Sequence, residues 1–194
     1  MTDHGGSSLT TLARGAVAEL DALFAKLPDD AADGLIDALV GAKRIAAYGC
    51  GREGLQIRGF VMRLFHLGLD VHVVGDMTTP PVGPGDLLLV SSGPGSLPTG
   101  DALIGEARGA GATVAVITAQ PDAPTPRSAD VVTVLPAQTM ADDRGGPAST
   151  RSVLPMGSLF EAGQMILFEV VVLRLRERLG ETAETMRARH TNLE

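Results

Sequence analysis

The stretch AAYGCGREG, from Ala46 to Gly54, decides the fold of this chain. The apolar run at 44–48 predicts a buried strand that stops before Gly49, and an amphipathic helical pattern begins at Leu55. We therefore expect a strand, a glycine-rich turn and a helix N-terminus. In an open parallel sheet, such a turn places backbone N–H groups and the positive end of a helix dipole where anions bind. Many such turns need glycine for geometry alone, and both interpretations stay open here.

On the C-terminal side of this stretch, short apolar runs alternate with helical patterns. The predicted strands cover residues 43–48, 70–74, 86–90, 113–118 and 130–135. Runs such as LLLV (87–90) and VAVI (114–117) are apolar at every position, which is typical of strands covered on both faces. The sequence therefore predicts an α/β fold, a three-layer α-β-α sandwich with a five-stranded parallel sheet and flavodoxin-like topology.

The remaining segments fit a single domain over residues 1–194, since this length suffices for one sizeable core. A leading helical hairpin (1–42) precedes the sheet core (43–135), and C-terminal helices and a tail (156–194) follow an irregular stretch at 136–155. The helix predicted over 156–179 is apolar around most of its circumference. Such a helix is buried on more than one side, which favours a homo-oligomer.

Composition argues against several classes of partner. The net charge is -7, no Lys/Arg run is present and aromatic residues make up 3%, so we expect no nucleic-acid binding. No apolar run approaches membrane-spanning length, and the first residues lack the pattern of a signal peptide. The single cysteine, Cys50, fits a reducing compartment. We expect a cytoplasmic protein that does not bind membranes.

Candidate binding residues follow the strands, at the edge where the carboxyl ends of parallel strands meet. Two glycine-rich turns, at 49–53 and 91–96, offer backbone amides, hydroxyls and one arginine, which suit a phosphate or sugar hydroxyls. The expected substrate-binding residues are Gly49, Gly51, Arg52, Glu53, Thr79, Ser91, Ser92, Gly93, Gly95 and Ser96.

Across almost its whole length the chain resembles a single sugar isomerase (SIS) domain, and within that group the 6-phospho-3-hexuloisomerases. The segments that carry the resemblance are GCGREG (49–54), MRLFHLGLDVHVVGDMTTP (62–80), GDLLLVSSGPGS (85–96), PMGSLFE (155–161) and RHTNLE (189–194). The resemblance implies a metal-independent ketose isomerisation between D-arabino-3-hexulose 6-phosphate and fructose 6-phosphate. It also implies a homo-oligomer, a dimer or a tetramer, and no cofactor.

The chain departs from the family pattern in both turns. Glu53 stands where the first turn usually has serine, and Pro94 and Leu97 replace hydroxyl residues of the second. A carboxylate at Glu53 is expected to repel a phosphate dianion unless Arg52 or water offsets its charge. Two alternatives therefore stay open, namely an isomerase for a different, unphosphorylated substrate and a non-catalytic module that binds sugar phosphates.

Moving a carbonyl between adjacent carbons needs a base that shuttles one proton through a cis-enediol. Glu161, at which the resembling motif ends, is the first candidate, against the simpler interpretation that it favours a helix N-terminus. His190 is the second candidate, as ring-opening acid or proton relay, and the resemblance places it in a neighbouring subunit's site. His66 is a further candidate, with an interfacial structural role as the alternative. The scattered histidines and single cysteine give no metal-ligand spacing, so we predict no metal.

Overall fold

The computed structural model describes residues 7–142 and 152–193. The leading helices are α1 (Leu9–Phe24) and α2 (Asp33–Gly41). The alternating part comprises β1 (Ile45–Gly49), α3 (Gly51–His66), β2 (Val71–Val73), β3 (Leu87–Ser91), α4 (Pro98–Gly109), β4 (Thr113–Thr118), α5 (Pro124–Arg127) and β5 (Val131–Val134). The chain closes with α6 (Ser158–Leu179) and α7 (Ala183–Ala188).

The strands form one parallel sheet in the order β2-β1-β3-β4-β5. This is the flavodoxin-like order, so the predicted fold is confirmed. The strand order reverses between β1 and β3, because β2 lies on one side of β1 and β3 on the other. Gly49, the last residue of β1, pairs with Ser91, the last residue of β3. The two glycine-rich turns therefore leave the sheet side by side.

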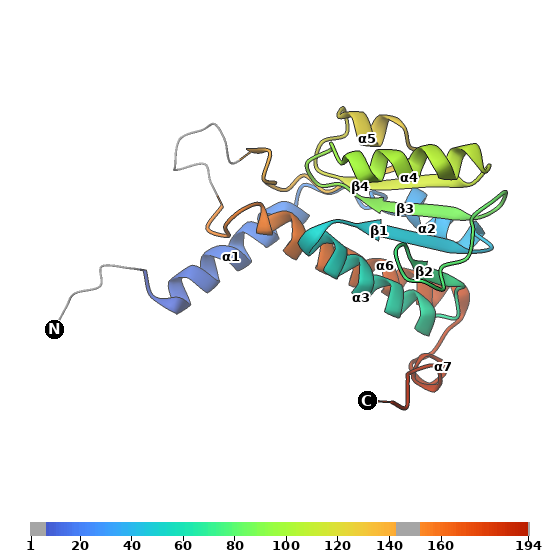
Figure 1. The fold of residues 1–194 in the computed structure, drawn as a ribbon. Coiled ribbons are helices and arrows are strands. Elements are labelled where there is room, and N and C mark those ends of the chain that lie inside the picture. The colour runs from blue at the N-terminus through green and yellow to red at the C-terminus, as the bar shows by residue number, and fades with distance from the viewer. Residues whose placement is uncertain (1–6, 143–151, 194) are drawn as a thin grey trace.

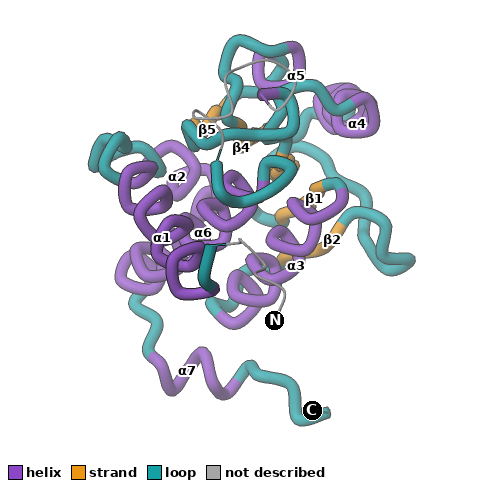
Figure 2. Tube along the Cα trace, turned by 90° about the vertical axis from the view of Figure 1, so that its left-hand side faces the viewer, coloured by secondary structure: helices purple, strands orange, loops and turns teal. Residues whose placement is uncertain are grey.

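Helices cover both faces of the sheet, with α4 on one side and α2, α3 and α6 on the other (Figures 1 and 2). Neighbouring residues of a strand point to opposite faces, and each face has its own core. Ile45 and Leu87 face the larger core under α2, α3 and α6, whereas Ala46 and Leu88 face the smaller core under α4. The uniformly apolar strands thus reflect burial on both sides.

The structure corrects two details of the predicted elements. Helix α3 begins at Gly51 rather than at Leu55, so most of the glycine-rich turn is the first turn of the helix. Its sequence, GREG, carries no apolar period that could mark it as helical. The short helix α5 was not expected in the sequence, since four residues are too few for a period. Of the irregular stretch at 136–155, residues 143–151 lie outside the described part.

Helices α1, α3 and α6 keep apolar side chains on their outer surfaces. The exposed residues on these helices are Leu9, Leu12, Val17, Leu55, Met62, Phe65, Met165, Ile166, Val170 and Leu173. The N-terminal part of α1 extends beyond the body of the domain (Figure 1). The described part of the chain contains no helix with the length and apolar character needed to cross a bilayer.

Candidate active site

A cavity of about 430 Å³ opens where β1 and β3 end, at the point where the strand order reverses. Open α/β sheets bind their ligands at this position. The residues that line it are Cys50, Gly51, Arg52, Glu53, Ser91, Ser92, Pro94, Ser96, Leu97, Met140, Pro155, Met156, Ser158 and Glu161. They include seven of the predicted site residues, from both glycine-rich turns and from α6.

Glycines in the first turn allow the strand and the helix to approach closely. A Cβ on Gly54 would lie 2.5 Å from the carbonyl oxygen of Gly49, and one on Gly49 would lie 3.0 Å from the Gly54 backbone. Gly51 has φ of 57° and lines the cavity itself. Gly49 therefore serves the geometry of the turn, which was one of the two interpretations of the stretch.

The second turn is shaped in the same way by Gly93 and Gly95. Gly95 has φ of 76°, and a Cβ there would lie 2.3 Å from Cβ of Ala123. A Cβ on Gly93 would lie 2.8 Å from Cδ1 of Phe160 and 3.0 Å from Oε1 of Glu53. Both positions exclude a side chain, although neither residue lines the cavity.

Glu53 is turned inward and joins the two turns. Its Oε2 accepts a hydrogen bond of 2.5 Å from the Ser91 hydroxyl, and the Gly93 N–H lies 3.0 Å from Oε2 and 3.2 Å from Oε1. Burial raises the pKa of Glu53 and the charge of Glu161 adds to this, while the bonds from Ser91 and Gly93 oppose it. The carboxylate that was expected to face the ligand is thus turned into a hydrogen-bonded position between the two turns.

Glu161 lies in the first turn of α6 and forms an ion pair with Arg52. Nε of Arg52 donates to Oε2 of Glu161 at 2.5 Å. The Glu161 side chain is 14% exposed and that of Arg52 65%, so the carboxylate is sheltered while the guanidinium reaches solvent. The pair combines a candidate base with a cation at the mouth of one cavity.

Ser92 is a buried hydroxyl without a partner. It lines the cavity and is 1% exposed, and within residues 7–142 and 152–193 its Oγ makes no hydrogen bond. A buried polar group without a partner is costly, and a ligand that bonds to it relieves that cost. Ser92 is therefore a ready-made contact for a polar ligand, together with the more exposed Ser96.

Three helices begin at this cavity. Residues from the first turns of α3 and α6 and the N-cap residue of α4, Leu97, all line it. Helix N-termini carry partial positive charge and N–H groups without intrahelical partners. The convergence of three such ends makes the cavity suited to an anion.

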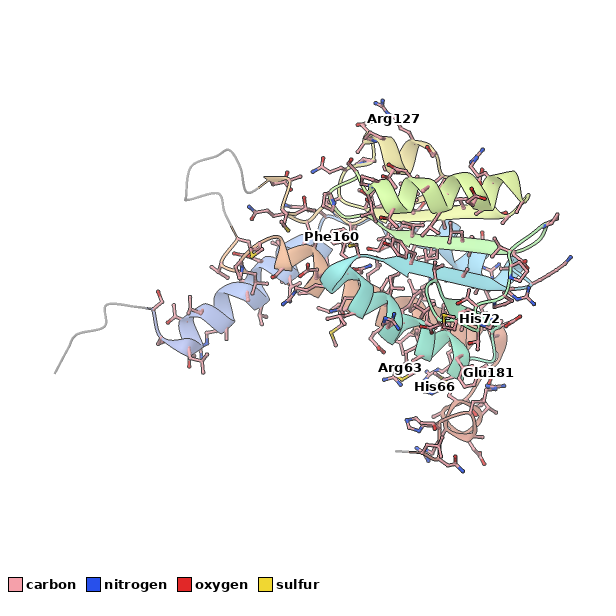
Figure 3. The ribbon with its side chains drawn as sticks, in the orientation of Figure 1. Arg63, His66, His72, Arg127, Phe160 and Glu181 are labelled. Atoms are coloured by element: carbon pink, nitrogen blue, oxygen red, sulfur yellow. The ribbon has the colours of Figure 1, made fainter. Side chains whose placement is uncertain are left out.

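Six predicted site residues do not line the cavity: Gly49, Gly93 and Gly95, which shape the two turns, and Thr79, His66 and His190, which lie elsewhere. The Thr79 hydroxyl donates to the carbonyl of Val73 at 2.6 Å, so it stabilises its own loop. His66 ends α3, whereas Arg52 lies near its beginning, so about 21 Å of helix at ~1.5 Å per residue separates them. In Figure 3, His66 and Phe160, which lies at the start of α6, are seen in different parts of the molecule.

The tail holds His190 beside His66, at the end of α3 away from the cavity. The two imidazole rings stack with their centroids 5.2 Å apart. Arg189 donates to the carbonyl of His66 at 2.8 Å and to both carboxylate oxygens of Glu181. Hydrogen bonds from Arg189 and then from Thr185 lower the pKa of Glu181 to about 2. In its own subunit, His190 is therefore remote from Glu161.

The structure adds residues that the sequence analysis did not assign to the site. Met140 and Met156 line the cavity, and Met156 is the one described non-glycine residue with positive φ, 55°. A Cβ on the following Gly157 would lie 2.6 Å from the Met140 nitrogen, so the two segments are packed backbone to backbone. Strained backbone of this kind is common at binding sites. The sequence feature that could have identified Met140 is its place in the irregular stretch at 136–155.

Within residues 7–142 and 152–193, no group of three or more His, Cys, Asp or Glu side chains is arranged to hold a metal ion.

Comparison with known proteins places the chain in a family. A model of the SIS domain matches residues 38–163. A 3-hexulose-6-phosphate isomerase from Bacillus subtilis is 34% identical over 91% of this chain and 94% of the relative. Another from Mycobacterium gastri is 41% identical over 78% of this chain and 74% of the relative.

A solved structure agrees with these sequence matches. It is a hypothetical protein from Methanococcus jannaschii, from which a function as 3-hexulose-6-phosphate isomerase was inferred. It superposes with a TM-score of 0.77 at 28% identity and covers 96% of this chain and 98% of its own. The chain belongs to the SIS domain family.

Proposed function

We propose that this chain is a sugar-phosphate isomerase that interconverts D-arabino-3-hexulose 6-phosphate and fructose 6-phosphate. The observation that carries the proposal is the pairing of Glu161 with Arg52 in a cavity where three helices begin. The helix ends, the cation and the Ser92 hydroxyl suit a phosphorylated substrate. The names of the relatives supply the identity of the sugar.

In this proposal Glu161 is the base. Its carboxylate removes the proton from C2 of the 3-ketose, which gives a cis-enediol across C2 and C3. It then returns the proton to C3, which leaves the carbonyl at C2. One base on one face of the substrate suffices for both transfers. General-base catalysis requires that the base lies within hydrogen-bond distance of the proton and has a suitable proton affinity. The ion pair with Arg52 holds the Glu161 carboxylate at the cavity.

We further propose that the active form is a homo-oligomer in which His190 reaches the cavity of a neighbouring subunit. It stacks on His66 at the end of α3 away from its own cavity, which supports a place in a neighbouring subunit's site. The exposed apolar side chains of α3 and α6 supply surface for such an assembly. A cytoplasmic location stays a prediction from the sequence.

The decisive experiment measures fructose 6-phosphate formed from the 3-hexulose phosphate in a coupled assay. We expect turnover by the wild-type chain, and a loss of about 10²–10⁴-fold in kcat for Glu161→Gln, with an unchanged melting temperature. Glu169→Gln is the matched control, because Glu169 lies on the same helix but pairs with Arg63 on the surface. It should retain full activity.

Two results contradict the proposal. Wild-type protein that turns over only unphosphorylated hexulose supports the alternative substrate, which Glu53, Pro94 and Leu97 suggested. Wild-type protein that binds sugar phosphates but converts none of them supports a module that only binds its ligand.

A further inference from the structure

The cavity contains a second carboxyl group, and its surroundings differ from those of Glu161. Glu161 pairs with Arg52, the one cationic side chain among the described residues that line the cavity. Glu53 has no cationic partner in the described part of the chain and accepts hydrogen bonds only from the neutral groups of Ser91 and Gly93. Two carboxyl groups with such different environments in one cavity are suited to opposite roles, one as base and one as acid.

A buried network fixes the position of Glu53. The Gln164 side-chain amide, which is 0% exposed, donates to Oγ of Ser91 at 2.7 Å. The Ser91 hydroxyl is thereby directed to Oε2 of Glu53. The Gly93 N–H is shared between the two carboxylate oxygens, and Oε1 receives the longer of the two hydrogen bonds. Oε1 can therefore also carry a proton. The network spans α3, the end of β3 and α6, and holds the Glu53 carboxyl at the cavity wall.

The surroundings of the Glu53 carboxyl also raise its pKa. Burial is the main cause of the raised pKa of Glu53, and the negative charge of Glu161 adds to it. The charged side chains that line the cavity beside Glu53 are Arg52 on its own helix and Glu161 on α6, while the second turn contributes hydrogen bonds from Ser91 and Gly93. The Cys50 thiol is the other titratable group of the same wall.

We propose that Glu53 is the catalytic acid that works with Glu161, donating a proton to the substrate carbonyl oxygen while Glu161 removes the proton from the adjacent carbon. This inference rests on the proposed isomerase function. In the first step the C2–H proton passes to Glu161 and the Glu53 proton passes to O3, which gives the neutral enediol. In the second step Glu53 takes the proton from O2 and Glu161 returns its proton to C3. Both carboxyl groups end as they began, and no oxidant or other reactant is needed.

The test is the pH dependence of kcat in the wild-type enzyme and in Glu53→Gln. The wild type should lose activity at high pH as Glu53 ionises. Glutamine can still accept the bonds from Ser91 and Gly93 but cannot transfer a proton. We therefore expect kcat to fall about 10²–10⁴-fold and the decline at high pH to disappear, with the melting temperature preserved.

Ser91→Ala provides a second, gentler test. Because the Ser91 hydroxyl lowers the pKa of Glu53, its removal should shift the decline in kcat at high pH to higher pH. Cys50→Ser is the control for the thiol and should keep the wild-type decline. A residue that only joins the two turns would not move the profile in this way.

The outcomes separate this inference from the proposed function. An active wild type alongside Glu53→Gln with full kcat and an unchanged profile overturns the acid role alone. A wild type without any isomerase activity overturns the proposed function, and the acid role with it.

Discussion

The side chain of Arg52 contributes to the cavity in two ways. Its Nε pairs with Glu161, and most of its guanidinium stays in solvent at the cavity mouth. An ion pair that is so exposed adds little to the stability of the fold, about 0.2–1 kcal/mol. We therefore expect Arg52 to act by binding an anion and by holding the Glu161 carboxylate in place.

We expect Arg52→Gln to raise the KM for the sugar phosphate about tenfold or more, which corresponds to ~1.4 kcal/mol of binding free energy. The free energy of unfolding should change by less than about 1 kcal/mol. Steady-state kinetics and urea unfolding measure the two quantities. Arg58→Gln is the matched control, since Arg58 is an exposed residue of the same helix that pairs with Asp76. An unchanged KM in Arg52→Gln contradicts a role in substrate binding.

The sequence identified Arg52, Ser92 and Glu161 because each follows a strand or starts a helix at a recognisable motif. It did not predict the orientation of Glu53. The bond from Ser91 to Glu53 joins residues 38 positions apart, and Gln164 completes it from a third segment. A local pattern shows that a carboxylate is present, but only the packed structure shows which groups surround it.

At the scale of elements, the start of α3 depends on the close approach of Gly54 to the end of β1. A side chain at Gly54 would meet backbone, which cannot move without shifting the strand. Gly59 lies on the same helix and has open space around its Cβ position. Substituting each glycine in turn therefore distinguishes the steric requirement at Gly54 from the effect of helix propensity alone at Gly59.

We expect Gly54→Ala to lower the free energy of unfolding by roughly 1–3 kcal/mol, because the added methyl overpacks the turn. Gly59→Ala should raise it by roughly 0.5–1 kcal/mol, since alanine restricts the unfolded chain and favours helix. Urea denaturation of both variants checks the pair. Equal effects at the two positions contradict the close approach in the first turn.

The strands were predicted to within two residues because burial on both faces leaves uninterrupted apolar runs. Thr113–Thr118 is an example in which the predicted and observed bounds agree. The start of α3 was missed because its first turn is glycine-rich and polar, which also makes it able to contact a ligand. The elements that form the site are thus the ones whose sequence least resembles regular structure.

At the scale of the whole molecule, the parallel sheet sends α3 away from the cavity, and the tail returns only to the far end of that helix. Arg189 ties the tail there through His66 and Glu181. His190 is consequently positioned outward from its own site, where an adjacent subunit can present its cavity. A catalytic role for this histidine therefore requires assembly.

Mixing two inactive variants tests that arrangement. We expect Glu161→Gln and His190→Asn to be nearly inactive as separate homo-oligomers. Subunits of the two kinds, co-expressed with different tags and purified as mixed oligomers, should regain activity. In a mixed pair one cavity combines an intact Glu161 with an intact His190 from the neighbour, because each subunit supplies what the other lacks. Light scattering on the same samples establishes the subunit number. Mixed oligomers as inactive as their parents, or full activity in His190→Asn alone, contradict a role for His190 across the subunit boundary.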